Sequence, residues 1–130
     1  MNENDNVNHP THYTSGMPAI EPECIDFSAS MDFCQGNAFK YVWRAGNKID
    51  AIEDLQKAIW YLERCKAKKE PKRMPVWEYY LSKALDRDLD DITKQKLHIL
   101  ANICSNLFDT ATARIRILIS DLKKIEENKE

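Results

Sequence analysis

Apolar and polar residues alternate with helical spacing in two consecutive segments of this 130-residue chain, between about residues 37 and 62. Apolar residues recur every three or four positions there, which places them on one face of each helix and polar residues on the other. Gly46 lies where the first helix should end, because glycine readily adopts the positive φ that follows a last helical turn. Asp50 and Glu53 have the spacing of a capping box. The short link predicts an antiparallel helical hairpin.

Further helices are predicted on both sides of the hairpin. A short one opens near Glu21, with Pro22 in its first turn and Cys24, Ile25 and Phe27 or Met31 directed inward. Residues 76–85 form another helix and residues 90–125 a long one. Apolar residues of this last segment recur about every 3.5 positions, the spacing of a coiled-coil seam. They are Cys104, Leu107, Ala111, Ile115, Leu118, Leu122 and Ile125. The predicted fold class is all-α, a helical hairpin plus a long C-terminal helix, expected to assemble as a helical oligomer.

Composition divides the chain into four parts. Residues 1–20 are rich in Asn, Thr, Ser and Pro and poor in large apolar side chains, which predicts an extended N-terminal arm that is ordered only by docking. Residues 21–66 form the predicted site module. Residues 67–75 form a charged linker with two prolines, and residues 76–130 form a C-terminal helical oligomerisation region.

Charge and cysteine content narrow the classes of function. A net charge of −2 leaves no chain-wide basic field, so duplex nucleic acid is not an expected partner and anion binding must come from a local cluster. Four cysteines without a CxxC pair, and no apolar leader, predict reduced thiols and a cytoplasmic protein. No apolar run approaches the roughly 20 residues that span a bilayer. With only three glycines, the chain has no P-loop.

Basic and hydrogen-bonding residues gather on the polar face of the predicted hairpin. They are Asn37, Lys40, Tyr41, Arg44 and Lys48 in the first helix, and Asp54, Lys57 and Tyr61 in the second. Arginine is suited to bidentate phosphate contacts, and lysines supply point charges. Exposed cations also pair with acids for less than about 1 kcal/mol each. Spacing alone therefore favours surface ion pairs over an anion site.

Several separate stretches of sequence resemble a small phage-encoded family called SaV-like. They are VNHPTHYTSG from Val7, ECID from Glu23, DFCQGNAFKYVWRAGNK from Asp32 and EDLQKAIWYLER from Glu53. The resemblance covers residues 7–65, and it implies nucleotide chemistry because the family's best-known functional member is a phage nucleotide kinase without a P-loop. The AIEPE lead into ECID and the tail from about residue 75 depart from the family pattern. With this resemblance, the anion site becomes the favoured interpretation of the hairpin.

The leading hypothesis is a phage nucleotide-binding protein that transfers a phosphoryl group to a deoxynucleoside monophosphate, with a nucleoside triphosphate as donor. Arg44 and the lysines would neutralise the transferring group, and Asp54 would orient a cation or the acceptor. The arm would fold over the site. The expected catalytic residues are Arg44, Lys40, Asp54 and His9, and the expected ligand-binding residues are His12, Tyr13, Asn37, Tyr41, Lys48 and Lys57.

Two alternatives to catalysis are kept. The same pocket could sequester a nucleotide without turnover, or the apolar seam of the last helix could dock on a host protein as an adaptor. A requirement for Mg²⁺ is left open, because clustered carboxylates hold this ion in other helical proteins but helix capping and ion pairs explain these acids at least as well. The carboxylates are Glu23, Asp26, Glu53 and Asp54. His9 and His12 form a poor zinc signature, so no metal site is predicted.

Tryptophans at helical spacing are more often core residues than base-stacking platforms. Trp43 and Trp60 are accordingly assigned to packing.

Overall fold

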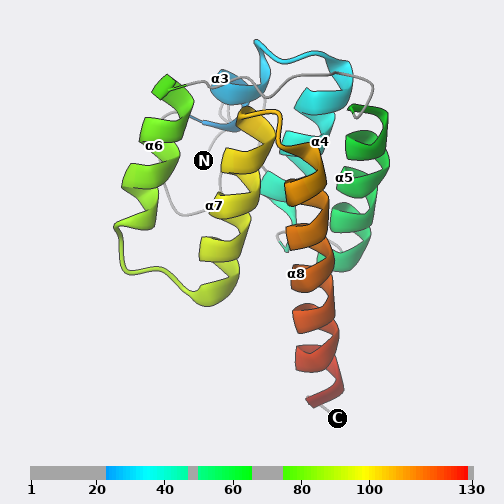
Figure 1. Ribbon diagram of the computed structural model, residues 1–130. Coiled ribbons are helices and arrows are strands. Elements are labelled where there is room, and N and C mark those ends of the chain that lie inside the picture. The colour runs from blue at the N-terminus through cyan, green and yellow to red at the C-terminus, as the bar shows by residue number, and fades with distance from the viewer. Residues whose placement is uncertain (1–22, 47–49, 66–74, 129–130) are drawn as a thin grey trace, which may run out of the picture.

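The computed structural model describes residues 23–46, 50–65 and 75–128, and every regular element in these ranges is a helix (Figure 1). The helices are α3 (Cys24–Ser28), α4 (Phe33–Arg44), α5 (Ala51–Cys65), α6 (Pro75–Leu85), α7 (Asp91–Cys104) and α8 (Phe108–Asn128). The predicted all-α fold class is confirmed. The predicted arm and charged linker, apart from Pro75, lie outside the described residues, as do His9, His12, Tyr13 and Lys48. Within the described ranges, no helix is long and apolar enough to cross a membrane.

Helices α4 and α5 pack side by side and form the predicted hairpin. Asp32 caps α4, since its carboxylate accepts a hydrogen bond from the backbone N–H of Gln35 at 2.8 Å. Gly46 follows the helix with a φ of +91°, as the sequence predicted. Asp50 precedes α5, and its carboxylate accepts from the backbone N–H of Ile52 at 2.9 Å. Local capping chemistry therefore sets where each helix of the hairpin begins.

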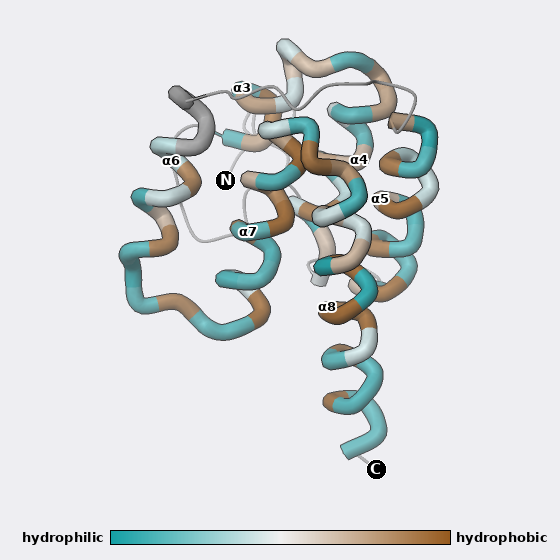
Figure 2. The backbone as a smooth tube through the Cα atoms, in the orientation of Figure 1, coloured by the Kyte–Doolittle hydropathy of each residue, from teal (hydrophilic) through white to brown (hydrophobic). Residues whose placement is uncertain are grey.

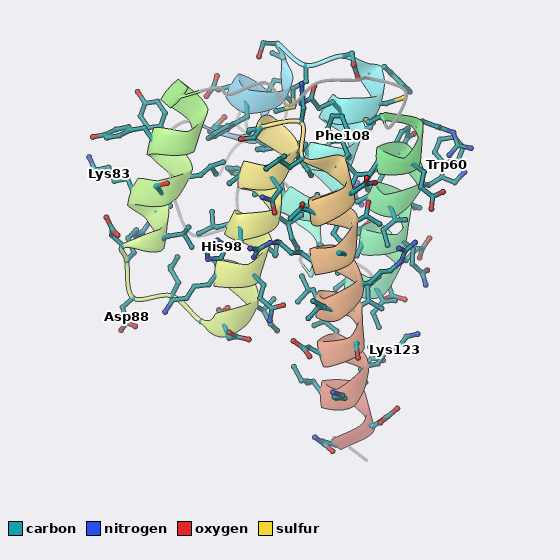
Figure 3. All side chains as sticks on the ribbon, viewed as in Figure 1. Trp60, Lys83, Asp88, His98, Phe108 and Lys123 are labelled. Atoms are coloured by element: carbon teal, nitrogen blue, oxygen red, sulfur yellow. The ribbon has the colours of Figure 1, made fainter. Side chains whose placement is uncertain are left out.

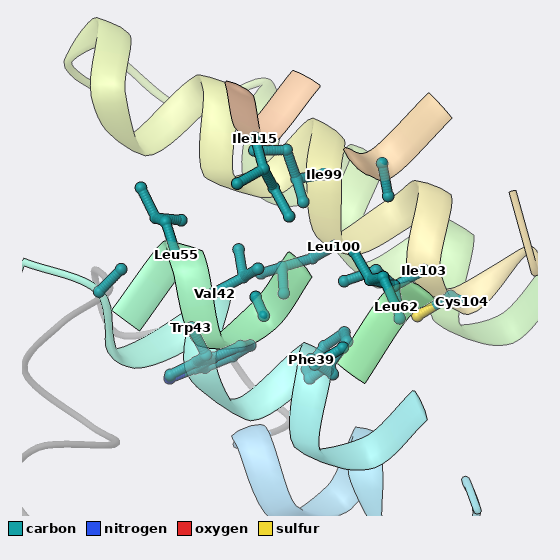
Figure 4. Close-up of a cluster of buried hydrophobic side chains, with 14 of the residues drawn as sticks. Phe39, Val42, Trp43, Leu55, Leu62, Ile99, Leu100, Ile103, Cys104 and Ile115 are labelled. Atoms are coloured by element: carbon teal, nitrogen blue, oxygen red, sulfur yellow. The ribbon is translucent and has the colours of Figure 1, made fainter. Parts of the chain in front are cut away.

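The apolar core lies where α4, α5, α7 and α8 meet (Figure 4). Its fully buried side chains include Phe39 and Val42 from α4, Leu55 and Leu62 from α5, Leu97, Ile99, Leu100 and Ile103 from α7, and Ile115 and Leu118 from α8. Full burial of one such side chain stabilises a fold by about 1.5–3 kcal/mol. Helix α6 packs on the outer side of α7 and buries Leu81 against it. The contact with α7 and α8 holds the hairpin by its apolar face. The opposite face of α4 and α5 is left to solvent.

Helix α3 closes one side of the core. Cys24 and Phe27 are buried, as predicted, and the ring of Phe27 stacks on Phe39 with centroids 5.2 Å apart. The inward placement predicted for Ile25 is wrong, because this side chain is exposed. The helix begins at Cys24, so residues three apart share its inner face and the intervening Ile25 is directed away.

The predicted continuous helix over residues 90–125 is wrong, because the chain breaks between α7 and α8. Asn106 has a φ of +60°. The N–H of Leu107 donates to the carbonyl oxygen of Asn102 at 2.9 Å, and the N–H of Asn106 donates to that of Ile103 at 3.1 Å. These two bonds define a Schellman motif, which usually has glycine at the left-handed position. Asparagine tolerates that conformation, so the helix ends without a glycine in the sequence.

A buried side chain from α4 holds this break in place. The Nε2 group of Gln35 donates to the carbonyl oxygen of Ile103 and to Oδ1 of Asn106, both at 2.8 Å. Gln35 is almost fully buried, so these bonds satisfy a polar group that would otherwise be costly in the interior. The turn between α7 and α8 is thereby tied to the first turn of α4.

The break turns most of the predicted coiled-coil seam into an intramolecular contact. Ala111, Ile115 and Leu118 are fully buried in the bundle, where α8 packs against α5 and α7. Leu122 is half-buried and Ile125 is exposed. The C-terminal end of α8 projects beyond the other helices (Figure 1), and this end is mostly hydrophilic (Figure 2).

The four cysteines take part in no disulfide. Cys24, Cys65 and Cys104 are buried, and Cys34 is half-buried. Burial raises the pKa of the Cys24 and Cys65 thiols to about 12, so both are protonated and unreactive near neutral pH.

Asn106→Ala should lower the free energy of unfolding by about 1–2 kcal/mol, because alanine in the left-handed conformation is strained. Asn106→Gly is the matched control: it loses the same contact with Gln35 but accepts the positive φ, so it should be about 1 kcal/mol more stable than Asn106→Ala. Urea unfolding of the three proteins measures the difference. Equal stability of the alanine and glycine variants would show that the left-handed residue does not determine the break.

Candidate functional site

Tyr41 lies at the centre of the polar face of the hairpin. Its ring stacks on that of Tyr61 from α5, with centroids 5.9 Å apart and planes inclined by 13°. Three cations surround the same ring: Lys40 Nζ and Lys57 Nζ each lie 5.5 Å from its centroid, and Arg44 Cζ lies 5.6 Å from it. At about 6 Å or less, a cation is attracted to an aromatic face. The structure thus brings three of the predicted site residues around the ring of a fourth, Tyr41. We call Lys40, Arg44 and Lys57 the cation cluster.

Asp54 holds Arg44 in place. Arg44 Nε lies 3.6 Å from Asp54 Oδ2, and the two side chains are only 18% and 6% exposed. Burial raises the pKa of the Asp54 carboxyl, while the charges of Arg44 and Lys57 act in the opposite direction. Arg44 Nε is buried and makes no hydrogen bond within the described residues, so charge attraction holds this pair. The pairing restricts the orientation of the guanidinium.

Lys96 of α7 lies behind this pair and was not singled out in the sequence. The residue is 3% exposed, and its Nζ donates to the backbone carbonyl oxygens of Trp43 at 2.9 Å and Ala45 at 2.8 Å. These carbonyls belong to the last turn of α4 and the residue after it, where an ammonium group compensates the negative end of the helix dipole. Lys96 therefore holds the C-terminal end of α4, which carries Arg44, from the interior of the bundle.

The pKa of Lys96 reflects its burial. Removal from water lowers the pKa from 10.5 to about 8, and the nearby carboxylates of Asp90 and Asp54 oppose this shift. One signal in the sequence marked the residue: Lys96 stands four positions before Leu100 and seven before Ile103, on the apolar face of its helix. A cation in such a stripe must find a polar partner inside the fold.

The remaining described residues of the predicted site are placed less centrally. Asn37 is half-buried, and its Nδ2 donates to the carbonyl oxygen of Phe33 in its own helix at 2.7 Å. Lys57 Nζ lies 3.3 Å from Glu53 Oε1, and both side chains are about half exposed. Lys40 is half-buried and forms no ion pair with any residue that the structure describes.

The carboxylates considered for Mg²⁺ do not converge. Asp26 Oδ2 accepts a hydrogen bond from the backbone N–H of Glu23 at 2.9 Å, which completes a capping box at the start of α3. Glu53 pairs with Lys57, and Asp54 pairs with Arg44. Across the described ranges, no three His, Cys, Asp or Glu side chains are grouped as metal ligands. Helix capping and ion pairing account for these four acids within the described residues, and the acids do not form one group of ligands.

The two tryptophans of the hairpin lie in opposite environments. Trp43 is buried against Phe27 and Phe39, with ring centroids 5.7 and 5.8 Å apart, so its assignment to packing is confirmed. The same assignment is wrong for Trp60, which is 51% exposed and points away from the bundle (Figure 3). The buried stripe of α5 runs through Ala58 and Leu62, and Trp60 lies midway between them on the opposite side of the helix.

The fold and the site define an all-helical protein with a surface of cations and aromatic rings on one hairpin. Residues 7–63 match the model of a family described as a protein of unknown function (DUF3310). The match includes α3, α4 and most of α5, and it covers less than half of the chain, because α6, α7 and α8 lie beyond it. Searches of curated proteins and of solved structures gave no match.

Proposed function

We propose that this chain is a phage nucleotide-binding protein of the SaV-like kind, that its α4–α5 face binds the phosphate groups of a nucleotide, and that it transfers a phosphoryl group to a deoxynucleoside monophosphate. The observation that carries the proposal is the cation cluster around Tyr41. Arg44 and Lys57 pair with Asp54 and Glu53, so Lys40 leaves the cluster with one positive charge in excess, and a bound phosphate would compensate this charge. The resemblance to SaV-like sequences supports a nucleotide as the source of that phosphate.

Each residue of the cluster has a defined part in this proposal. Asp54 holds Arg44 at its Nε edge, so the other N–H groups of the guanidinium donate to phosphate oxygens. Lys40 and Lys57 have flexible stems and neutralise further oxygens as point charges. Phosphoryl transfer depends mainly on positioning and charge neutralisation, so side-chain cations can serve where a P-loop is absent. A nucleoside triphosphate is the donor in this scheme.

Sequestration of a nucleotide without turnover is the second candidate function. The specific observation that favours it is the burial of Asp54 against Arg44. This carboxylate was expected to orient a cation or the acceptor, and its burial leaves it engaged with the cluster instead. Binding uses the same cations in both candidates, so only turnover separates them.

The adaptor alternative draws less support from the fold. It requires the apolar seam of the last helix to be available to a host protein. Ala111, Ile115 and Leu118 are instead buried within the chain. A homo-oligomer and the host cytoplasm as the place of action remain parts of our proposal.

A product assay tests the proposal. The purified protein is incubated with each deoxynucleoside monophosphate and a panel of nucleoside triphosphates, with and without Mg²⁺, and all nucleotides are separated by chromatography after denaturation. We expect a new deoxynucleoside diphosphate, and equal turnover by a Lys123→Ala control on the projecting end of α8. Complete recovery of nucleotides that the protein binds would indicate sequestration, and absence of both binding and turnover would contradict both candidates.

A further inference from the structure

Two large aromatic side chains of the hairpin are exposed, and each contacts the ring of Tyr61. Phe33 is 73% exposed in the first turn of α4, and Trp60 is 51% exposed in the second half of α5. Tyr61 lies between them: its ring centroid is 5.9 Å from that of Phe33 and 5.0 Å from that of Trp60, with edge-to-face geometry in both pairs. We call Phe33, Trp60 and Tyr61 the aromatic ledge. Contiguous exposed rings of this kind mark a binding surface, whereas a single exposed ring needs no explanation.

The aromatic ledge is continuous with the cation cluster. Tyr61 stacks on Tyr41, the ring around which the three cations gather. Lys40 lies seven positions after Phe33 in α4, or roughly 10 Å along the helix axis. A fourth cation lies on the ledge itself, because Arg64 Cζ is 3.1 Å from the centroid of the Trp60 ring and its NH1 group donates to the Trp60 carbonyl oxygen at 2.7 Å.

This combination of charges and rings selects the class of ligand. Inorganic phosphate would use the cations and leave the rings exposed, and an apolar partner would use the rings without needing the cations. A nucleotide has both parts, since its base presents a π-face and its phosphates are anionic. Surfaces that bind unpaired nucleotides combine cations for phosphate with aromatic rings for base stacking. The presence of both cations and exposed aromatic rings therefore favours a nucleotide.

We propose that the aromatic ledge is the base-binding subsite of this face, where the nucleobase stacks on Phe33 or on the face of Trp60 opposite Arg64, while the phosphates contact the cation cluster. This inference rests on the proposed function and adds the element that separates nucleotides from inorganic phosphates. Every base has a π-face, so stacking accepts all bases, with tighter binding of purines because their larger rings cover more of the ledge.

Calorimetric titration with two probes tests the ledge separately from the cluster. The probes are dGTP, which carries a base, and inorganic tripolyphosphate, which does not. In the double variant Phe33→Leu with Trp60→Leu, dGTP affinity should fall by about 10-fold or more, since stacking on an aromatic side chain contributes strongly for each base. Tripolyphosphate affinity should stay within about twofold of the parent, because both substitutions leave the three residues of the cation cluster unchanged. Tyr79→Leu, which removes an exposed ring from α6, is the matched control and should change neither affinity.

The outcomes separate this inference from the proposed function. Failure of the parent protein to bind either probe would remove the proposed function and the subsite together. Unchanged dGTP affinity in the double variant, with the parent binding both probes, would overturn the subsite alone. Loss of affinity for both probes in the double variant would also overturn the subsite, because the rings would then hold the cation cluster in position and would not bind the base. Trp60→Phe keeps a ring, so retention of more than half of the dGTP affinity by this variant would support stacking.

Discussion

Lys96→Met is expected to lower the free energy of unfolding by about 2 kcal/mol at neutral pH, because the carbonyl oxygens of Trp43 and Ala45 lose their buried donor. Methionine keeps the apolar stem of the side chain, so the change removes the ammonium group without opening a large cavity. Two buried carbonyl oxygens without a donor would cost more than this. Part of that cost is offset because the variant no longer buries a charged group. Lys94→Met, at an exposed position of the same helix, should change stability by less than about 0.5 kcal/mol.

The effect of Lys96 should depend on pH in a defined direction. Burial lowers its pKa from 10.5 to about 8, so between these values the unfolded chain binds a proton that the folded protein does not. The stability of the parent relative to Lys96→Met should therefore rise between pH 8 and 10.5, by up to on the order of 3 kcal/mol. The raised pKa values of Cys24 and Cys65 act oppositely, lowering stability above pH 9, but both thiols are present in the two proteins. A difference that stays constant over this range would contradict a desolvated Lys96.

Arg44→Ala is expected to weaken nucleotide binding by at least about 30-fold, because truncation of a partly buried charge at a binding site costs 2 kcal/mol or more. Arg44→Lys keeps the charge but loses the planar fork, so its loss should be intermediate. Asp54→Asn should also weaken binding, since the guanidinium loses the carboxylate that orients it. Calorimetric titration with dGTP measures the affinity of all three variants. Arg114→Ala, at an exposed position of α8, is the control.

Two outcomes of that series would count against the site. Full affinity in Arg44→Ala would show that the phosphates bind elsewhere. Equal affinity of Arg44→Lys and the parent would show that Arg44 acts only as a charge. The alanine variant leaves Asp54 buried without its cation, so thermal unfolding must first establish that each variant remains folded at the temperature of the titration.

Periodicity predicted the hairpin and most of its polar face correctly because the features involved are local. Residues three and four apart share a helix face whatever surrounds the helix, so Lys40, Tyr41 and Arg44 could be placed on one face of α4, and the predicted hairpin brought Lys57 of α5 to the same face. Spacing did not reveal which partner each polar group takes. Asn37 has the spacing that places it on the polar face of α4, yet its amide donates to the carbonyl oxygen of Phe33 one turn earlier in the same helix.

The features that the sequence did not predict depend on contacts between distant residues. Lys96 reaches the carbonyl of Trp43, 53 positions earlier, and Gln35 reaches Ile103, 68 positions later. The pattern within one helix can indicate that a polar side chain is buried, as it does for Lys96, but it does not identify the distant partner. The break at Asn106 was missed for another reason: the apolar spacing continues across it, and a left-handed asparagine, in place of the more usual glycine, ends α7. Trp60 was wrongly assigned to the core because tryptophan is usually buried, although its position in α5 faces solvent.

Mapping of backbone amide chemical shifts by NMR during a titration with dGTP tests the central claim most directly, namely that the α4–α5 face binds a nucleotide. We expect the largest changes from Lys40 to Arg44 in α4 and from Asp54 to Tyr61 in α5. The amides of α6 and of the projecting end of α8 should change little. Changes centred on α6 or α8, or none at dGTP concentrations well above those in cells, would contradict the claim.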